Sequence, residues 1–153
     1  DADGWTVVIA GEEIDDWRAQ LEAGVRRKGG GARVVFAGAS DERMQRGWLN
    51  RASLLVAPAL RVRCPVSAIA AMACKVPVLA TTLASPSVSA EALTQCAPET
   101  GALVEALREQ LTRSEPERAE SAERAHRIAR EELDWTTLVV RYEELYERLR
   151  TSR

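Results

Sequence analysis

PALRVRCPVSAIAAMACKVPVLATT, residues 58–82, decides the fold. Its first residues close an apolar run that begins at Ser53, and its last residues, VPVLATT, form a second apolar run rich in β-branched side chains. Between them lie a loop with two arginines and an Ala-rich segment. Pro65 can open that segment as a helix, because a missing N–H costs nothing in a first helical turn. The stretch predicts two strands joined by a loop and a buried helix.

The same alternation of strand and helix continues along the chain. Apolar strands are predicted over 5–10, 32–37, 53–58 and 76–82, with a short one near 93–96. Helices are predicted from 12 to 28 and over 41–51, 65–74, 100–112, 115–132 and from 135 onward. Strands that are apolar throughout are typical of a parallel sheet covered on both faces. We expect an α/β domain over 1–153, with a Rossmann-like doubly wound sheet, helices on both faces and C-terminal helices.

Helical spacing also predicts which faces pack inward. The faces are Ile14, Trp17, Leu21 and Val25; Ile69, Met72 and Ala73; alanines 119, 122, 125 and 129; and Trp135, Leu138, Tyr142, Leu145 and Leu149. The last face either packs in the core or docks a partner. Ser40 is the expected N-cap of the helix over 41–51.

Composition limits the function classes. The 153 residues carry a net charge of −2 with acids and bases interspersed, which gives no electrostatic case for nucleic acid. No apolar run approaches the roughly 20 residues that cross a bilayer. Cys64, Cys74 and Cys96 are too widely spaced for a disulfide framework or a zinc site, so a reducing cytoplasm is the default localisation. The chain begins at Asp1 without Met, and we expect that a segment has been removed ahead of it.

Ligands of such folds bind beyond the carboxyl ends of the strands. The loops on that edge are 11–13, 38–41, 58–66 and 82–88. In an extended segment Arg61 and Arg63 leave on the same side, beside the N-terminus of the following helix. This pattern suits a phosphate or another anion. The alternative is that both are solvated loop arginines.

The sequence lacks the residues that several kinds of catalytic and binding site require. His126 is the only histidine and lies far from the loop edge, so neither Ser87 nor Ser89 has a partner for a hydrolase triad. The glycines form neither G-x-G-x-x-G nor a P-loop. We predict no catalytic residue and no metal site.

The order of these segments resembles the C-terminal, nucleotide-sugar-binding domain of retaining GT-B glycosyltransferases of the family-4 type. WTVVIAGEE is similar to that family's strand ending in a Gly-containing turn, and ARVVFAGASDERMQRGWLNRASLLVAPAL to its V-x-F-x-G … A-D-x-x-x-x-P-S segment. AAMACKVPVLATT resembles E-A-M-A-C-G-x-P-V-V-A-T, and the ending with Trp and Tyr also matches. The likeness covers nearly the whole chain.

The resemblance implies a degenerate donor site. The family's two signature glutamates, which contact the transferred sugar and the ribose hydroxyls, fall on Val62 and Ala70. The Gly after A-M-A-C is Lys75, at an expected left-handed position that costs about 1 kcal/mol. Losing two charged acceptors, at roughly 1.5–3 kcal/mol each, predicts donor binding weaker by roughly two to four decades.

The residues expected to form the remaining binding site are Gly11, Gly38, Ser40, Arg61, Arg63 and Val66. No cofactor is expected beyond a possible nucleotide-sugar donor. The resemblance further implies that the first strand–helix unit and the N-terminal acceptor domain are missing. We expect a partner N-terminal domain or another subunit.

Three hypotheses stay open. The first is a degenerate, non-catalytic glycosyltransferase domain. The second is the donor half of an active enzyme that uses Arg61 and Arg63. The third is a Rossmann-like nucleotide or anion-binding module unrelated to sugar transfer.

Overall fold

The computed structural model describes residues 4–12, 16–29, 33–60 and 65–151. The chain divides into two compact units, Asp1–Trp48 and Leu49–Arg153. All described strand pairs are parallel, and helices follow the strands along the chain. The predicted α/β class is therefore confirmed.

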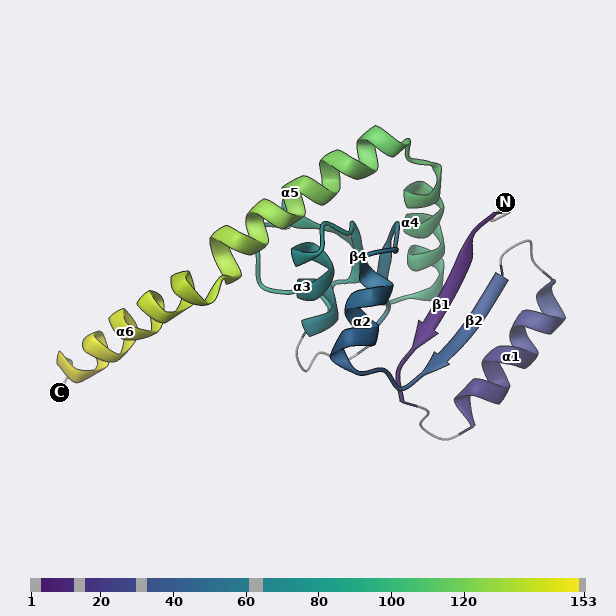
Figure 1. Cartoon of the computed structure of the whole chain (residues 1–153), viewed down its shortest axis with the longest axis horizontal. Helices are drawn as coiled ribbons and strands as arrows, with labels where there is room; N and C mark the ends of the chain where they lie inside the picture. The colour runs from purple at the N-terminus through teal and green to yellow at the C-terminus, as the bar shows by residue number, and fades with distance from the viewer. Residues whose placement is uncertain (1–3, 13–15, 30–32, 61–64, 152–153) are drawn as a thin grey trace. The chain divides into compact units, whose positions relative to one another are not determined.

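Unit 1 holds a two-stranded parallel sheet. β1 (Thr6–Ala10) pairs with β2 (Arg33–Gly38), and α1 (Trp17–Lys28) connects them (Figure 1). The guanidinium of Arg18 on α1 lies 5.6 Å from the centroid of the Phe36 ring on β2, so α1 contacts this sheet. α2 (Glu42–Leu49) follows β2.

Two local predictions in unit 1 need correction. The cap of α2 is Asp41, not Ser40, because the Asp41 Oδ1 accepts the Met44 N–H at 2.7 Å. The predicted inward face of α1 is exposed: Trp17, Leu21 and Val25 are 60%, 44% and 42% exposed. Ile14 lies outside the described residues.

Unit 2 is built around a three-stranded sheet with the order β3-β4-β5. The strands are β3 (Leu55–Ala57), β4 (Val78–Thr81) and β5 (Thr94–Cys96). α3 (Val66–Ala73) contacts β3 and β4, whereas α4 (Thr100–Thr112) contacts β4 and β5. Figure 1 shows β4 between these two helices. All four residues of β4 are buried.

The remaining helices complete unit 2. α5 (Glu115–Leu133) packs on α3 and on the 3₁₀ turn η1 (Ala90–Ala92). α6 (Trp135–Thr151) follows it and, among the described elements, packs chiefly against α5. α6 has no buried residue and Trp135 is 73% exposed, so of the two alternatives for its apolar face, core packing is wrong and partner docking is untested.

The core lies between α3, α5 and β4, and small side chains let these elements approach closely. Ala68, Ala71 and Met72 of α3 are fully buried. The buried face of α3 therefore differs from the predicted one, since Ala73 is exposed. On α5 the predicted alanine stripe is confirmed at 122, 125 and 129, while Ala119 is exposed.

The end of α3 is held in a left-handed turn. Val76 N–H donates to Ala71 O at 2.9 Å and Lys75 N–H to Met72 O at 3.1 Å, which is the hydrogen-bond pattern of a Schellman cap. Lys75 has φ 57°, as predicted from its alignment with a glycine. Its Nζ lies 2.6 Å from Glu123 Oε1 on α5. This hydrogen bond lowers the pKa of the Glu123 carboxyl.

Two substitutions at Lys75 separate backbone strain from the ion pair. Both Lys75→Gly and Lys75→Ala remove the pair with Glu123, but only Gly adopts φ 57° without strain. We expect the free energy of unfolding, measured by urea denaturation, to be about 1 kcal/mol higher for the Gly variant than for the Ala variant. Equal stabilities would contradict a strained Lys75.

Candidate functional site at the carboxyl edge

Gly11 and Gly38 meet at the carboxyl ends of β1 and β2 in unit 1. Gly11 N–H donates to Gly38 O at 2.9 Å, just after the register of β1 and β2 shifts. Gly11 has φ 146° and Gly38 has φ 69°, so each adopts a backbone conformation that L side chains rarely take. Among the described residues other than its chain neighbours, none has a heavy atom within 4 Å of a Cβ placed at either glycine. Backbone conformation is therefore the reason for glycine at both positions.

The other predicted contacts are divided between the units. Ser40 is half-buried in unit 1, and its backbone O accepts the Gln45 Nε2 at 3.0 Å. Val66 is the first residue of α3 in unit 2 and is 60% exposed. Arg61 and Arg63, with Val62 between them, lie outside the described residues. The structure thus brings Gly11 and Gly38 together and leaves the arginine prediction untested.

Sequence reasoning missed Thr81, which anchors the entrance to the arginine loop. Thr81 ends β4 and is 2% exposed, and its Oγ1 donates to the Ala59 carbonyl at 2.6 Å. A hydroxyl at the end of an otherwise apolar strand is the signal that could have found it. This hydrogen bond holds the backbone that leads from β3 toward α3.

A second missed contact holds the loop after β4. Both the N–H and the Oγ of Ser89 donate to the carboxylate of Glu132 at the end of α5, the N–H at 3.1 Å. Ser89 precedes η1, where Ala92 is 1% exposed. Nothing local in the sequence pairs these positions, because they are 43 residues apart.

α3 offers few chemical groups at this edge. Its eight residues, VSAIAAMA, include one hydroxyl and no ionisable side chain. Ala70 is half-buried and presents only a methyl group. His126 on α5 lies at the other end of α3, with Nδ1 3.3 Å from Met72 O, which is a packing contact. Among the residues that the structure describes, no group of His, Cys, Asp and Glu could hold a metal ion.

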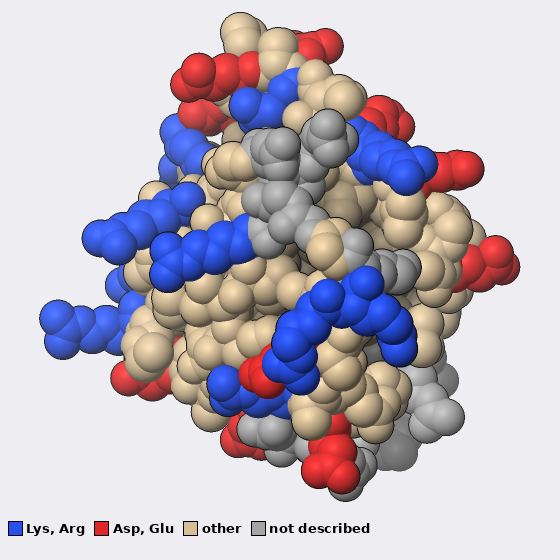
Figure 2. All heavy atoms as spheres, turned by 90° about the vertical axis from the view of Figure 1, so that its right-hand side faces the viewer, with Lys and Arg blue, Asp and Glu red and all other residues tan. Residues whose placement is uncertain are grey.

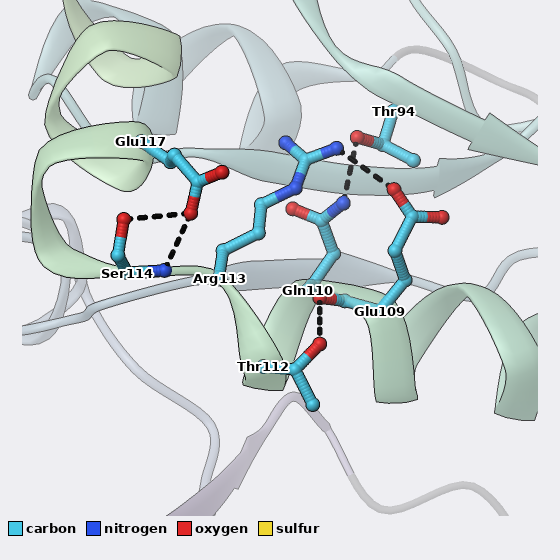
Figure 3. Close-up of polar contacts among 7 residues, drawn as sticks. All are labelled: Thr94, Glu109, Gln110, Thr112, Arg113, Ser114 and Glu117. Carbon is cyan, nitrogen blue, oxygen red and sulfur yellow. Dashed lines mark hydrogen bonds and ion pairs between the residues drawn. The ribbon is translucent and has the colours of Figure 1, made fainter.

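A charged groove lies elsewhere, at the junction of α4 and α5. It is lined by Glu109, Thr112, Arg113, Glu117, Glu120, Ser121 and Arg124. Figure 3 shows Arg113 paired with Glu109, and Ser114 donating its hydroxyl and its N–H to Glu117. These bonds from Ser114 lower the pKa of the Glu117 carboxyl.

The role of this groove is structural. α4 follows β5 and is 13 residues long, so its far end lies about 20 Å from the carboxyl edge at 1.5 Å per residue. The charges of the groove pair with one another along the helices, and Ser114 with Glu117 forms a capping box.

Charge on the visible surface is mixed. The face shown in Figure 2 carries both Lys and Arg side chains and Asp and Glu side chains. On α1, Glu22 pairs with Arg18 at 2.9 Å and with Arg26 at 3.7 Å. In the described part of the chain, no helix has both the length and the apolar character to span a bilayer.

Parallel strands that alternate with helices along the chain define an α/β domain of the Rossmann-like class. The family model for glycosyl transferases group 1 matches residues 1–113. The chain belongs to this family. No curated protein matches the sequence.

Solved structures agree on a GT-B glycosyltransferase fold. Sucrose-phosphate synthase from Thermosynechococcus elongatus matches 95% of this chain with a TM-score of 0.74 and 22% identity. WaaG, a glycosyltransferase involved in lipopolysaccharide biosynthesis, matches 80% with a TM-score of 0.65 and 25% identity. The catalytic domain of starch synthase IV from Arabidopsis thaliana, bound to ADP and acarbose, matches 95% with a TM-score of 0.65 and 16% identity. The matches cover 39%, 33% and 32% of those chains, respectively.

The anchor at Thr81 is tested by an isosteric change. Thr81→Val keeps the volume of the side chain but removes the donor to Ala59 O. We expect the free energy of unfolding to fall by about 1 kcal/mol and amide exchange in residues 58–60 to accelerate. The matched control is Thr82→Val, at an exposed position, which should change stability by less than about 0.5 kcal/mol. Similar effects from both variants would show that the hydrogen bond does not hold the loop.

Proposed function

We propose that this chain is the nucleotide-sugar half of a group 1 glycosyltransferase whose donor site has lost its side-chain acceptors. Family membership supports the class of ligand. The proposal that the donor site is weakened is supported by one observation: α3, the helix that follows β3, has no carboxylate along its length.

The position that matters most is Ala70. In the family pattern a glutamate there accepts hydrogen bonds from ribose. Ala70 is half-buried, next to the fully buried Ala71, so it lies at the border between core and solvent. A methyl group at this position accepts no hydrogen bond, and a charged acceptor contributes roughly 1.5–3 kcal/mol per bond. Ribose recognition is therefore the first function that the site loses.

Backbone groups still favour a phosphate. The first N–H groups of a helix have no acceptor within the helix and carry partial positive charge. In α3 the Ile69 N–H donates to Pro65 O at 3.0 Å. The N–H groups of Val66, Ser67 and Ala68 belong to the first turn of the helix. A neighbour of the same fold is described with ADP bound. We therefore infer that this helix end binds a diphosphate weakly and that the site makes few contacts with ribose or sugar.

The proposal predicts a gain of function. Wild-type chain titrated with a panel of nucleoside diphosphate sugars should give no measurable heat at micromolar concentration. Val62→Glu combined with Ala70→Glu should tighten binding of at least one donor by 100-fold or more, which corresponds to roughly 3 kcal/mol. Isothermal calorimetry measures both.

The control for this experiment is Ser67→Glu, which adds a carboxylate at an exposed position of the same helix. It should not improve binding. Micromolar affinity of the wild-type chain that disappears in Arg61→Ala with Arg63→Ala would overturn the proposal in favour of a divergent active site. Micromolar binding of plain nucleotides or phosphate by the wild-type chain would instead indicate an anion-binding module.

A further inference from the structure

Glu132 lies where three segments of unit 2 meet. It is half-buried near the end of α5, and its carboxylate accepts both the N–H and the hydroxyl of Ser89. Its backbone O accepts the Nη1 of Arg141, a residue of α6, at 3.4 Å. One residue of α5 therefore holds the loop after β4 with its side chain and α6 with its main chain.

The bond from Arg141 satisfies a helix end. The last carbonyl groups of a helix have no N–H partner within the helix and carry partial negative charge, so a guanidinium group is favourable there. Glu132 is the next-to-last residue of α5, which ends at Leu133. α6 begins at Trp135, and Arg141 lies nearly two turns into it. A side chain that reaches back over this distance restricts the angle between the two helices.

The direction of α6 depends strongly on this junction. α6 has no buried residue and, among the described elements, packs chiefly against α5. Figure 1 shows α6 continuing from the end of α5. The carboxylate of Asp134 accepts the N–H and the hydroxyl of Thr136. Those bonds order the first turn of α6, whereas the bond from Arg141 reaches back to α5.

The loop after β4 is held at both of its ends. At the carboxyl edge, the Thr82 N–H donates to Cys96 O at 2.9 Å. At the other end, Ser89 opens η1, and the Ala92 N–H donates to Ser89 O at 2.9 Å. η1 packs on α5, and Ala92 is 1% exposed. A shift of the Glu132 carboxylate therefore acts on a segment that joins the core to the carboxyl edge.

We propose that Glu132 couples the direction of α6 to the conformation of the loop between β4 and η1. With Arg141 bound to the end of α5, the Glu132 carboxylate is held where Ser89 donates to it. When α6 turns away from α5, both bonds weaken together. Since the loop begins at the carboxyl edge, a change in the direction of α6 reaches the edge where ligands of this fold class bind. The inference is independent of the proposed donor binding, because no bond in it involves a ligand.

Amide exchange, measured by mass spectrometry, tests the coupling in both directions, because a coupling free energy between two sites is reciprocal. Ser89→Ala removes one bond to Glu132 and should accelerate exchange in residues 137–141 roughly threefold. Arg141→Ala should accelerate exchange in residues 89–93 by a similar factor, although the bond that it removes goes to Glu132 and not to that segment. Unchanged exchange across the junction in either variant would overturn the proposal.

Matched controls change the same chemical groups at neighbouring positions. Arg148→Ala removes a guanidinium whose Nε bonds within α6, to Glu144 O at 3.4 Å. Glu131→Ala removes an exposed carboxylate next to Glu132. Both should leave exchange in residues 89–93 unchanged. Acceleration by these controls equal to that in the test variants would show a general loss of stability and would contradict the coupling.

Removing the shared residue gives the largest effect. Glu132→Ala should accelerate exchange on both sides of the junction tenfold or more, which corresponds to about 1.4 kcal/mol. If this variant loses protection throughout unit 2, the double variant of Ser89→Ala with Arg141→Ala decides. Its effect should be smaller than the two single effects combined, because each single change already weakens the shared contact. Strictly additive effects would show two independent bonds that merely share one residue.

Discussion

The structure depends on one constraint: a parallel strand needs partners on both edges and cover on both faces. β4 meets it completely, because β3 and β5 pair with its edges, α3 and α4 cover it, and every residue is buried. Close cover requires small side chains, which explains why Ala68 and Ala71 of α3 have no exposed surface. The same packing fixes the axis of α3, and with it the place where the N-terminus of the helix meets the carboxyl edge. Among the described strands β1 pairs only with β2, and no described residue of unit 1 is buried.

Local signals in the sequence predicted most elements well. The helix predicted over 100–112 is α4, and the strand predicted near 93–96 is β5. The left-handed Lys75 was predicted differently, from its alignment with a glycine of the family pattern. For α4 and β5 the residues that set the structure are neighbours in the chain.

Predictions that needed knowledge of the surroundings were less successful. Helical spacing placed Ala73 on the buried face of α3, yet a helix made almost entirely of small apolar residues has no polar stripe to fix its rotation. Spacing also predicted a buried face for α1, and it could not show that unit 1 offers too little surface to cover Trp17. Ser40 and Asp41 are both good N-caps, and only the geometry of the turn selects Asp41.

The same distinction applies to the candidate site. Positive φ at Gly11 and at Gly38 could be predicted, because a glycine at the end of an apolar strand is typical of a turn with positive φ. The anchors at Thr81 and Ser89 could not, because their partners, Ala59 and Glu132, are 22 and 43 residues away. Loop position in this protein is set by long-range hydrogen bonds that leave little trace in local sequence. Local sequence therefore indicates backbone conformation at the strand ends better than it indicates which side chains hold the loops.

The proposed loss of the acceptor at position 70 is compatible with an intact fold. The residues that pack against the sheet, Ala68 and Met72, are distinct from Ala70, which borders the solvent. A carboxylate at the border of the core costs desolvation, and Ala has the highest helix propensity of all residues. Replacing such an acceptor by Ala is therefore neutral or favourable for folding, even though it removes ligand contacts. Stability alone gives no reason to retain a carboxylate at this position, so only use of the ligand could keep it there.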